Sequence, residues 1–94
     1  MPTLRIEHAV PSFESWKQAF DSDPVDRKGS RVRRYTVGRA VDDRNYVTID
    51  LEFDTVADGE EFLSKMRQVW EGPGAAFMID PKARIVEHVE VRRL

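Results

Sequence analysis

The chain has 94 residues, the size of one domain, and we expect residues 1–94 to form a single domain. Its 15 basic and 17 acidic side chains give a net charge of −2, which argues against a general affinity for nucleic acid or acidic membranes. The lack of cysteine excludes disulfides and thiolate metal sites, and no apolar run reaches membrane length. We therefore expect a cytoplasmic protein without a membrane partner.

The first predicted elements are a strand and a helix. Apolar and polar side chains alternate from Thr3 to Val10, which is typical of a strand. Ser12 is a good N-cap, and apolar residues at helical spacing predict a helix from about Phe13 to Phe20. The following segment, Asp23 to Lys28, has the composition of one short helical turn.

The middle of the chain predicts a β-hairpin. Residues 31–41 have an extended pattern, and Asp42-Asp43-Arg44-Asn45 is a polar turn. In residues 45–53 apolar side chains alternate strictly with polar ones. Successive side chains of a strand point to opposite sides, so this strand has one apolar face and one polar, acidic face.

A second helix is expected after the hairpin, with Thr55 as its cap and an apolar stripe reaching Trp70. Residues 75–82 are expected to be irregular, and residues 83–91 to form a fourth strand. This order predicts an α+β protein with the ferredoxin-like βαββαβ fold, in which two main helices cover one face of a four-stranded antiparallel sheet.

The other face of such a sheet must tolerate water or find a partner. If Val41 pairs with Tyr46, then Tyr35 lies opposite Glu52 on this open face, and Arg39 joins them. A slip of one residue would place Tyr35 under the helices instead. We prefer the first register and expect a homodimer that packs sheet against sheet around a semi-polar cavity.

Three segments, Arg34 to Val37, Val41 to Val47 and Leu51 to Asp54, give the chain a pattern that resembles the dimeric α/β-barrel superfamily. That superfamily includes antibiotic-biosynthesis-type monooxygenases, heme-degrading monooxygenases and polyketide cyclase-like proteins. The resemblance implies a homodimeric α/β barrel and, as in the cofactor-free members, binding of aromatic, polyketide-like substrates. Heme-degrading members carry a histidine on the second helix, where this chain has Phe62 and Leu63. We therefore expect no heme and no other cofactor.

Two acidic side chains are candidates for proton transfer. Asp50 and Glu52 lie two residues apart on one strand, so both carboxylates share a face, about 7 Å apart along the chain. Paired carboxylates in a sheltered site can serve as acid and base. The alternative, which we favour, is a ladder of ion pairs to Arg33 and Arg39.

The two histidines, His8 and His88, are expected on neighbouring strands, where they could approach each other. A divalent metal would need a third ligand, so we expect no metal site and predict a hydrogen-bonded, partly buried His8 that can act as a proton shuttle. Trp16 and Trp70 lie on the apolar stripes of their helices and are expected in the core.

The residues leave two functions open, and they leave open whether the chain is an enzyme. We favour a homodimer that binds a small aromatic or polyketide-like molecule and, as the resemblance implies, oxygenates or cyclises it without a cofactor. The candidate site residues are His8, Asp50 and Glu52 for catalysis and Tyr35, Tyr46 and Arg39 for ligand binding. The alternative is a noncatalytic binding or stress-related structural dimer. An enzyme should have a cavity and at least one displaced pKa, whereas a structural dimer should have closed ion pairs.

Overall fold

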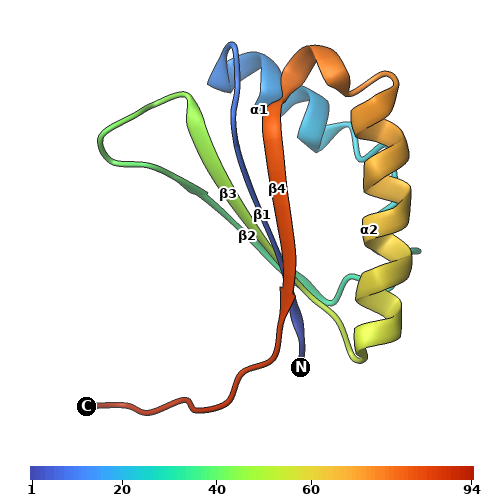
Figure 1. Ribbon diagram of the computed structural model, residues 1–94, viewed down its shortest axis with the longest axis vertical. Helices are drawn as coiled ribbons and strands as arrows, with labels where there is room; N and C mark the ends of the chain where they lie inside the picture. Colours follow the sequence, from blue (N-terminus) through green and yellow to red (C-terminus); the bar gives the residue numbers. More distant parts are fainter.

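The computed structural model describes all 94 residues. Its elements in chain order are β1 (Thr3–Ala9), α1 (Phe13–Asp21), β2 (Arg34–Arg39), β3 (Tyr46–Glu52), α2 (Val56–Glu71), the 3₁₀ turn η1 (Ala75–Phe77) and β4 (Ile79–Val86). The strands form one antiparallel sheet in the order β2-β3-β1-β4. Both helices lie on the same side of this sheet (Figure 1). The predicted ferredoxin-like order and helix-covered face are therefore confirmed.

Side-chain caps start both helices where the sequence predicts. The Ser12 hydroxyl accepts a hydrogen bond from the Ser15 backbone N–H at 3.4 Å, and the Thr55 hydroxyl accepts one from the Asp58 N–H at 3.1 Å. Neither helix is both long enough and apolar enough to cross a membrane. The buried core between helices and sheet consists of Leu4, Ile6, Val10, Trp16, Val32, Val47, Ile49, Leu51, Phe53 and Phe62.

The preferred hairpin register is wrong by one residue. Tyr35 pairs with Leu51, not with Glu52, so β2 turns Tyr35, Val37 and Arg39 toward the helices. The reason is the length of the loop between the two strands. Ala40 donates its N–H to the Tyr46 carbonyl, so the loop has five residues, 41–45, and not the expected four.

A distant contact fixes this loop length. Asn45 does not close a four-residue turn, because it binds the junction between β1 and α1. Its backbone oxygen accepts from the Val10 N–H at 2.8 Å, and its side-chain oxygen accepts from the Phe13 N–H at 3.2 Å. The hairpin register thus depends on residues more than thirty positions away in the chain.

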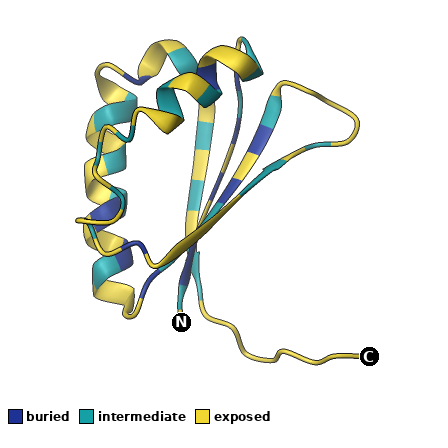
Figure 2. Cartoon of the chain, turned by 180° about the vertical axis from the view of Figure 1, so that it is seen from behind, coloured by how far each residue is buried: buried dark blue, intermediate teal, exposed yellow.

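The fourth strand starts and ends earlier than the sequence predicts. Its first residues include Pro81, which an edge strand tolerates because one side of its backbone needs no hydrogen-bonded neighbour. The strand ends at Val86 because Val86 pairs with Thr3, the first residue of β1, and no neighbour exists beyond it. Residues 87–94 leave the sheet as an exposed tail (Figures 1 and 2). His88 therefore lies outside the strand in which the sequence placed it.

The predicted helical turn at residues 23–28 is absent, and residues 22–33 form an ordered loop. Asp23, Asp26 and Arg31 have positive φ angles, which a helical turn does not contain. The loop is held locally by the Asp23 carboxylate, which accepts the Arg27 N–H at 2.9 Å. Arg31 fastens it to α2, with Nη1 at 3.3 Å from carboxylate oxygens of both Asp58 and Glu61.

Candidate functional site

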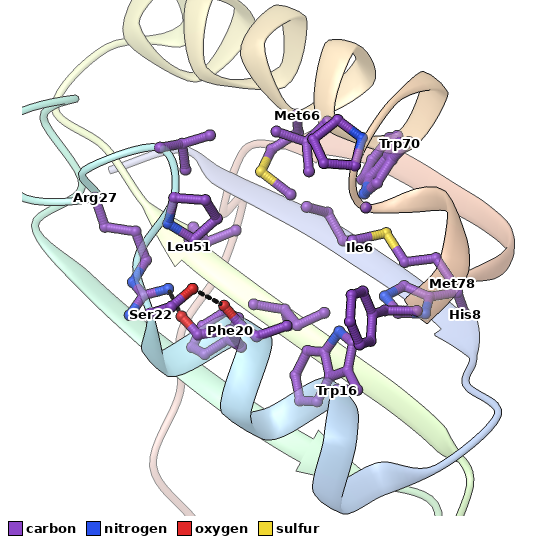
Figure 3. A pocket seen from close by; sticks show the side chains of 18 of the residues that line it. Ile6, His8, Trp16, Phe20, Ser22, Arg27, Leu51, Met66, Trp70 and Met78 are labelled. Carbon is purple, nitrogen blue, oxygen red and sulfur yellow. Dashed lines mark hydrogen bonds between the residues drawn. The ribbon is translucent and has the colours of Figure 1, made fainter.

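A cavity of about 320 Å³ lies between the sheet and the two helices. Ile6 and Leu51 come from the sheet, Trp16 and Phe20 from α1, and Met66 and Trp70 from α2 (Figure 3). Thirteen of its 19 lining residues are hydrophobic, so a molecule that fits must be largely apolar. The volume lies near the lower end of the range of small-molecule sites, about 300–1,000 Å³.

The aromatic wall of this cavity follows from the spacing of residues on α1. Trp16 and Phe20, four positions apart on one helix face, have ring centroids 5.2 Å apart. The His8 ring from β1 meets Trp16 edge-on at 6.0 Å. Flat side chains therefore line one side of the cavity, and their faces and edges suit a flat ring system.

His8 is the buried titratable group in the cavity, with 1% of its surface exposed. Its Nδ1 lies 3.0 Å from the carbonyl oxygen of Ala9. A carbonyl oxygen can only accept, so Nδ1 carries the proton and Nε2 keeps a lone pair. Burial lowers the pKa of His8 below its ordinary value of 6.5. His8 is thus a neutral base at neutral pH, and the hydrogen bond of its ring is made by Nδ1, not by Nε2.

Three further polar side chains line the cavity: Trp70, Arg27 and Ser22, whose hydroxyl donates to the Ala19 carbonyl at 2.6 Å. The indole Nε1 of Trp70 is buried and has no hydrogen-bond partner. The Arg27 guanidinium is largely satisfied, because Nη1 donates to the Phe20 carbonyl at 2.7 Å and Nε lies 3.4 Å from Asp23 Oδ1. The guanidinium also stacks 4.0 Å from the Phe20 ring centroid. The group without a partner is therefore the Trp70 donor, not the arginine.

The ligand-binding candidates Tyr35 and Arg39 lie on the helix side of the sheet, contrary to the preferred register. Tyr35 meets Phe20 edge-on with ring centroids 5.3 Å apart and lies beside Arg27. Arg39 stacks over the Phe13 ring at 4.6 Å. Both contacts are with α1 or the loop after it, and neither side chain lines the cavity.

The carboxylate candidates lie on the open face, each beside a cation. The Arg5 Nε is 3.4 Å from Asp50 Oδ1, and the Arg34 Nε is 3.1 Å from Glu52 Oε2. The expected ladder exists, but its bases are directly opposite residues on the neighbouring strands. The partners predicted from the sequence, Arg33 and Arg39, are wrong: Arg33 binds Asp54 at 2.7 Å, and Arg39 lies on the other face.

Tyr46 also lies on the open face, as expected. Its hydroxyl donates to the Glu7 carboxylate at 2.8 Å. This hydrogen bond is the main reason that the pKa of Tyr46 is raised above its ordinary value. The sheet therefore separates Tyr46, Asp50 and Glu52 from His8, so the candidates predicted from the sequence do not form one site.

The two histidines do not approach each other. The His88 Nε2 lies 2.9 Å from the Thr3 hydroxyl, at the start of β1, whereas His8 lies near the end of that strand. No group of three or more His, Asp or Glu side chains in the chain is arranged to hold a metal ion.

Sequence reasoning missed several residues of the cavity. It assigned Trp70 to the core, and it expected only an irregular segment at residues 75–82, which include Met78. Trp70 and Met78 both line the cavity, as do Met66 and Arg27. The helical stripe predicted that Trp70 faces inward, but no local signal indicates that its N–H lacks an acceptor.

Comparison with known proteins adds solved structures of the same shape. No protein-family model and no curated protein matches the chain. A Nitrosomonas europaea protein provisionally named as an antibiotic biosynthesis monooxygenase aligns over 94% of this chain and 89% of its own, with a TM-score of 0.73 and 15% identity. This similarity in shape agrees with the ferredoxin-like fold described above.

Two further structures support this fold. A Deinococcus radiodurans protein with the same provisional name aligns over 100% of this chain and 98% of its own, with a TM-score of 0.69 and 14% identity. A dimeric ferredoxin-like protein from an uncultured marine organism aligns over 100% of both chains, with a TM-score of 0.60 and 9% identity. At these identities the likeness establishes the architecture and leaves the chemistry to the residues themselves.

Proposed function

We propose that this chain is a small-molecule-binding homodimer that takes an aromatic, polyketide-like compound into the cavity between sheet and helices, and oxygenates or cyclises it without a cofactor. His8 is the proposed proton acceptor, because the hydrogen bond of its ring is made by Nδ1, not by Nε2, and the cavity holds no carboxylate. The neutral, buried imidazole is the observation that carries the proposal. The provisional names of several similar structures agree with it.

The alternative to an enzyme is a dimer with a purely structural role. The structure favours such a role only for the charged side chains on the open face of the sheet. Asp50 and Glu52 lie in ion pairs with Arg5 and Arg34, the closed arrangement expected of groups that maintain architecture. Exposed pairs of this kind contribute about 0–1 kcal/mol each, so they position the strands more than they stabilise them. We therefore move the proposed chemistry from the open face to the cavity, and His8 is the catalytic candidate that remains there.

The homodimer is supported by surface that the single chain leaves uncovered. Its accessible surface is 6498 Å², whereas a compact monomer of 10.9 kDa has about 5600 Å². The excess is close to the roughly 800 Å² that one partner contributes to a standard interface. Val89 and Val91 of the tail are 97% and 87% exposed. A second copy that covers the tail and the open face accounts for both observations, and some proteins of similar structure are dimers.

Ligand binding can be tested by thermal unfolding with 1-naphthol and related hydroxylated aromatic compounds. A ligand at a hundred times its dissociation constant stabilises the folded state by about 2.7 kcal/mol. We expect such stabilisation in the wild-type chain and weaker stabilisation after Ala19→Phe, which places a ring in the cavity lining. If no aromatic compound raises the melting temperature, the proposed binding function is wrong.

The chemical step needs a separate assay. Compounds that bind are incubated with the protein in air, and oxygen uptake and products are followed. We expect turnover that falls at least a hundredfold in His8→Gln, because a general base contributes about 10²–10⁴-fold. Glu52→Gln on the open face is the control and should retain turnover. Turnover that survives in His8→Gln and is lost in Glu52→Gln would place the chemistry on the other face.

A further inference from the structure

The cavity contains a donor and an acceptor that do not satisfy each other. The Trp70 Nε1–H is buried without a partner, and the hydrogen bond of the His8 ring is made by Nδ1, not by the acceptor Nε2. Figure 3 shows the indole of Trp70 projecting from α2 toward the cavity, across from Trp16 of α1. A buried N–H without an acceptor destabilises the folded state by about 1–3 kcal/mol, so such groups are rare and call for an explanation.

The side chains next to Trp70 along the chain offer no acceptor for its N–H. Its neighbours in the lining along α2 and the following turn are Met66, Val69, Pro73 and Gly74. None of these side chains carries an oxygen or nitrogen acceptor, and the indole itself can only donate. A molecule that enters the cavity is the remaining source of an acceptor, and it would have to displace the side chains that cover Nε1.

We propose that the Trp70 indole N–H binds a carbonyl oxygen of the ligand, so that the cavity selects neutral ring ketones over hydrocarbons of the same shape. This inference rests on the proposed function and names the chemistry that its site recognises. The lining contains no carboxylate, and its one cation, Arg27, is already engaged, so no free charge awaits a charged ligand. A hydroxyl near the ketone would complete the match by donating to His8 Nε2. Trp70 is in this view a specificity-determining residue.

Two bicyclic probes isolate the carbonyl. 1-Tetralone and tetralin have nearly the same shape, and only 1-tetralone offers an oxygen. We expect 1-tetralone to bind about three- to tenfold more tightly, the value of one net hydrogen bond. The chain has two tryptophans, so its ¹⁵N spectrum has two indole N–H signals. The Trp70 signal should move downfield with 1-tetralone and much less with tetralin.

Two variants complete the test. Trp70→Phe keeps a ring and removes the donor, so 1-tetralone should lose its advantage while tetralin binds as before. Trp16→Phe shrinks another ring of the same cavity, and it should change the binding of both probes to the same extent. The wild-type spectrum tests the inference even if Trp70→Phe does not fold.

The outcomes separate the two proposals. If both probes bind equally and the Trp70 signal responds equally to both, the ketone inference is overturned while the binding site stands. If 1-tetralone keeps its advantage in folded Trp70→Phe, another donor recognises the carbonyl and the role of Trp70 is wrong. If neither probe binds, both the proposed function and the inference drawn from it fail.

Discussion

Tyr35 lies edge-on against Phe20, with ring centroids 5.3 Å apart. This contact joins β2 to α1 and is possible only because Tyr35 pairs with Leu51 on the helix side of the sheet. Arg27 lies beside both rings, 4.0 Å from the Phe20 centroid and 4.9 Å from that of Tyr35. The three side chains fasten the end of α1 and the loop that follows it to the edge of the sheet.

The contribution of this contact can be measured by substitution. Tyr35→Ala removes one aromatic pair and one cation–π contact, and we expect it to lower the free energy of unfolding by about 1–2 kcal/mol. Thr36→Ala, its neighbour on the open face, should change stability by less than about 0.5 kcal/mol. Urea unfolding of both variants gives the comparison. A larger effect at Thr36 than at Tyr35 would favour the other register.

Two glycines near α2 should respond in opposite ways to alanine. At Gly59, a Cβ would lie 3.5 Å from Ile85 Cδ1 and Phe53 Cδ2, which is ordinary van der Waals contact. We expect Gly59→Ala to stabilise the chain by up to about 1 kcal/mol, because alanine favours a helix interior. At Gly74, a Cβ would lie 2.6 Å from Val69 Cγ1 and 2.8 Å from its carbonyl oxygen. Gly74→Ala should therefore destabilise it.

Thermal melting of these two variants checks the packing at each end of α2. Equal effects of the same sign would contradict either the close approach at Gly74 or the ordinary contact distances at Gly59. Neither substitution alters charge, so the comparison is independent of pH and salt.

The lowered pKa of His8 predicts how stability depends on pH. The unfolded chain binds a proton at His8 below about pH 6.5, whereas the buried imidazole resists it. The unfolded state then holds more protons, so the free energy of unfolding falls as the pH drops below 6.5. The slope from this group is at most about 1.4 kcal/mol per pH unit. The wild type should lose more stability between pH 7.5 and 5.5 than His8→Gln does.

His88, the other histidine of the chain, provides the control. His88→Gln should keep the pH dependence of the wild type, because it leaves the buried His8 unchanged. A pH dependence that disappears in His88→Gln and persists in His8→Gln would show that the tail histidine, not the cavity, is responsible.

The tail provides a test of the proposed dimer. We expect sedimentation to give twice the 10.9 kDa mass of the chain at micromolar concentration. Replacing Val89 and Val91 by serine should shift the chain toward monomers, because it removes apolar surface that a partner would cover. If the wild type is monomeric at these concentrations, the proposal of a second copy is wrong.

Local signals in the sequence predict most of the fold. The caps at Ser12 and Thr55 and the alternation in β1 and β3 depend only on neighbouring residues, and the structure confirms them. The hairpin register was not predictable in this way, because Asn45 sets it through contacts with Val10 and Phe13. The end of β4 depends on where β1 begins, which is also a distant relationship.

Some residues of the candidate site were also predictable from local signals, and others were not. Alternation along β1 predicts that His8 faces the helices, and it does. By contrast, Tyr35 and Arg39 were assigned to the wrong face through the register, and the unpartnered donor of Trp70 becomes visible only when its neighbours are known. The orientation of a residue was predictable where it follows from the residue's own strand, and it was not predictable where it follows from contacts with distant residues.

The most direct test of the central claim uses the three methionine methyl groups of the chain. Met66 and Met78 line the cavity, whereas Met1 does not and is 59% exposed. In a ¹³C-methyl spectrum titrated with 1-naphthol, we predict that the Met66 and Met78 signals move together in a saturable way while the Met1 signal stays. Saturable binding that leaves Met66 and Met78 unmoved would contradict a ligand site between the sheet and the helices.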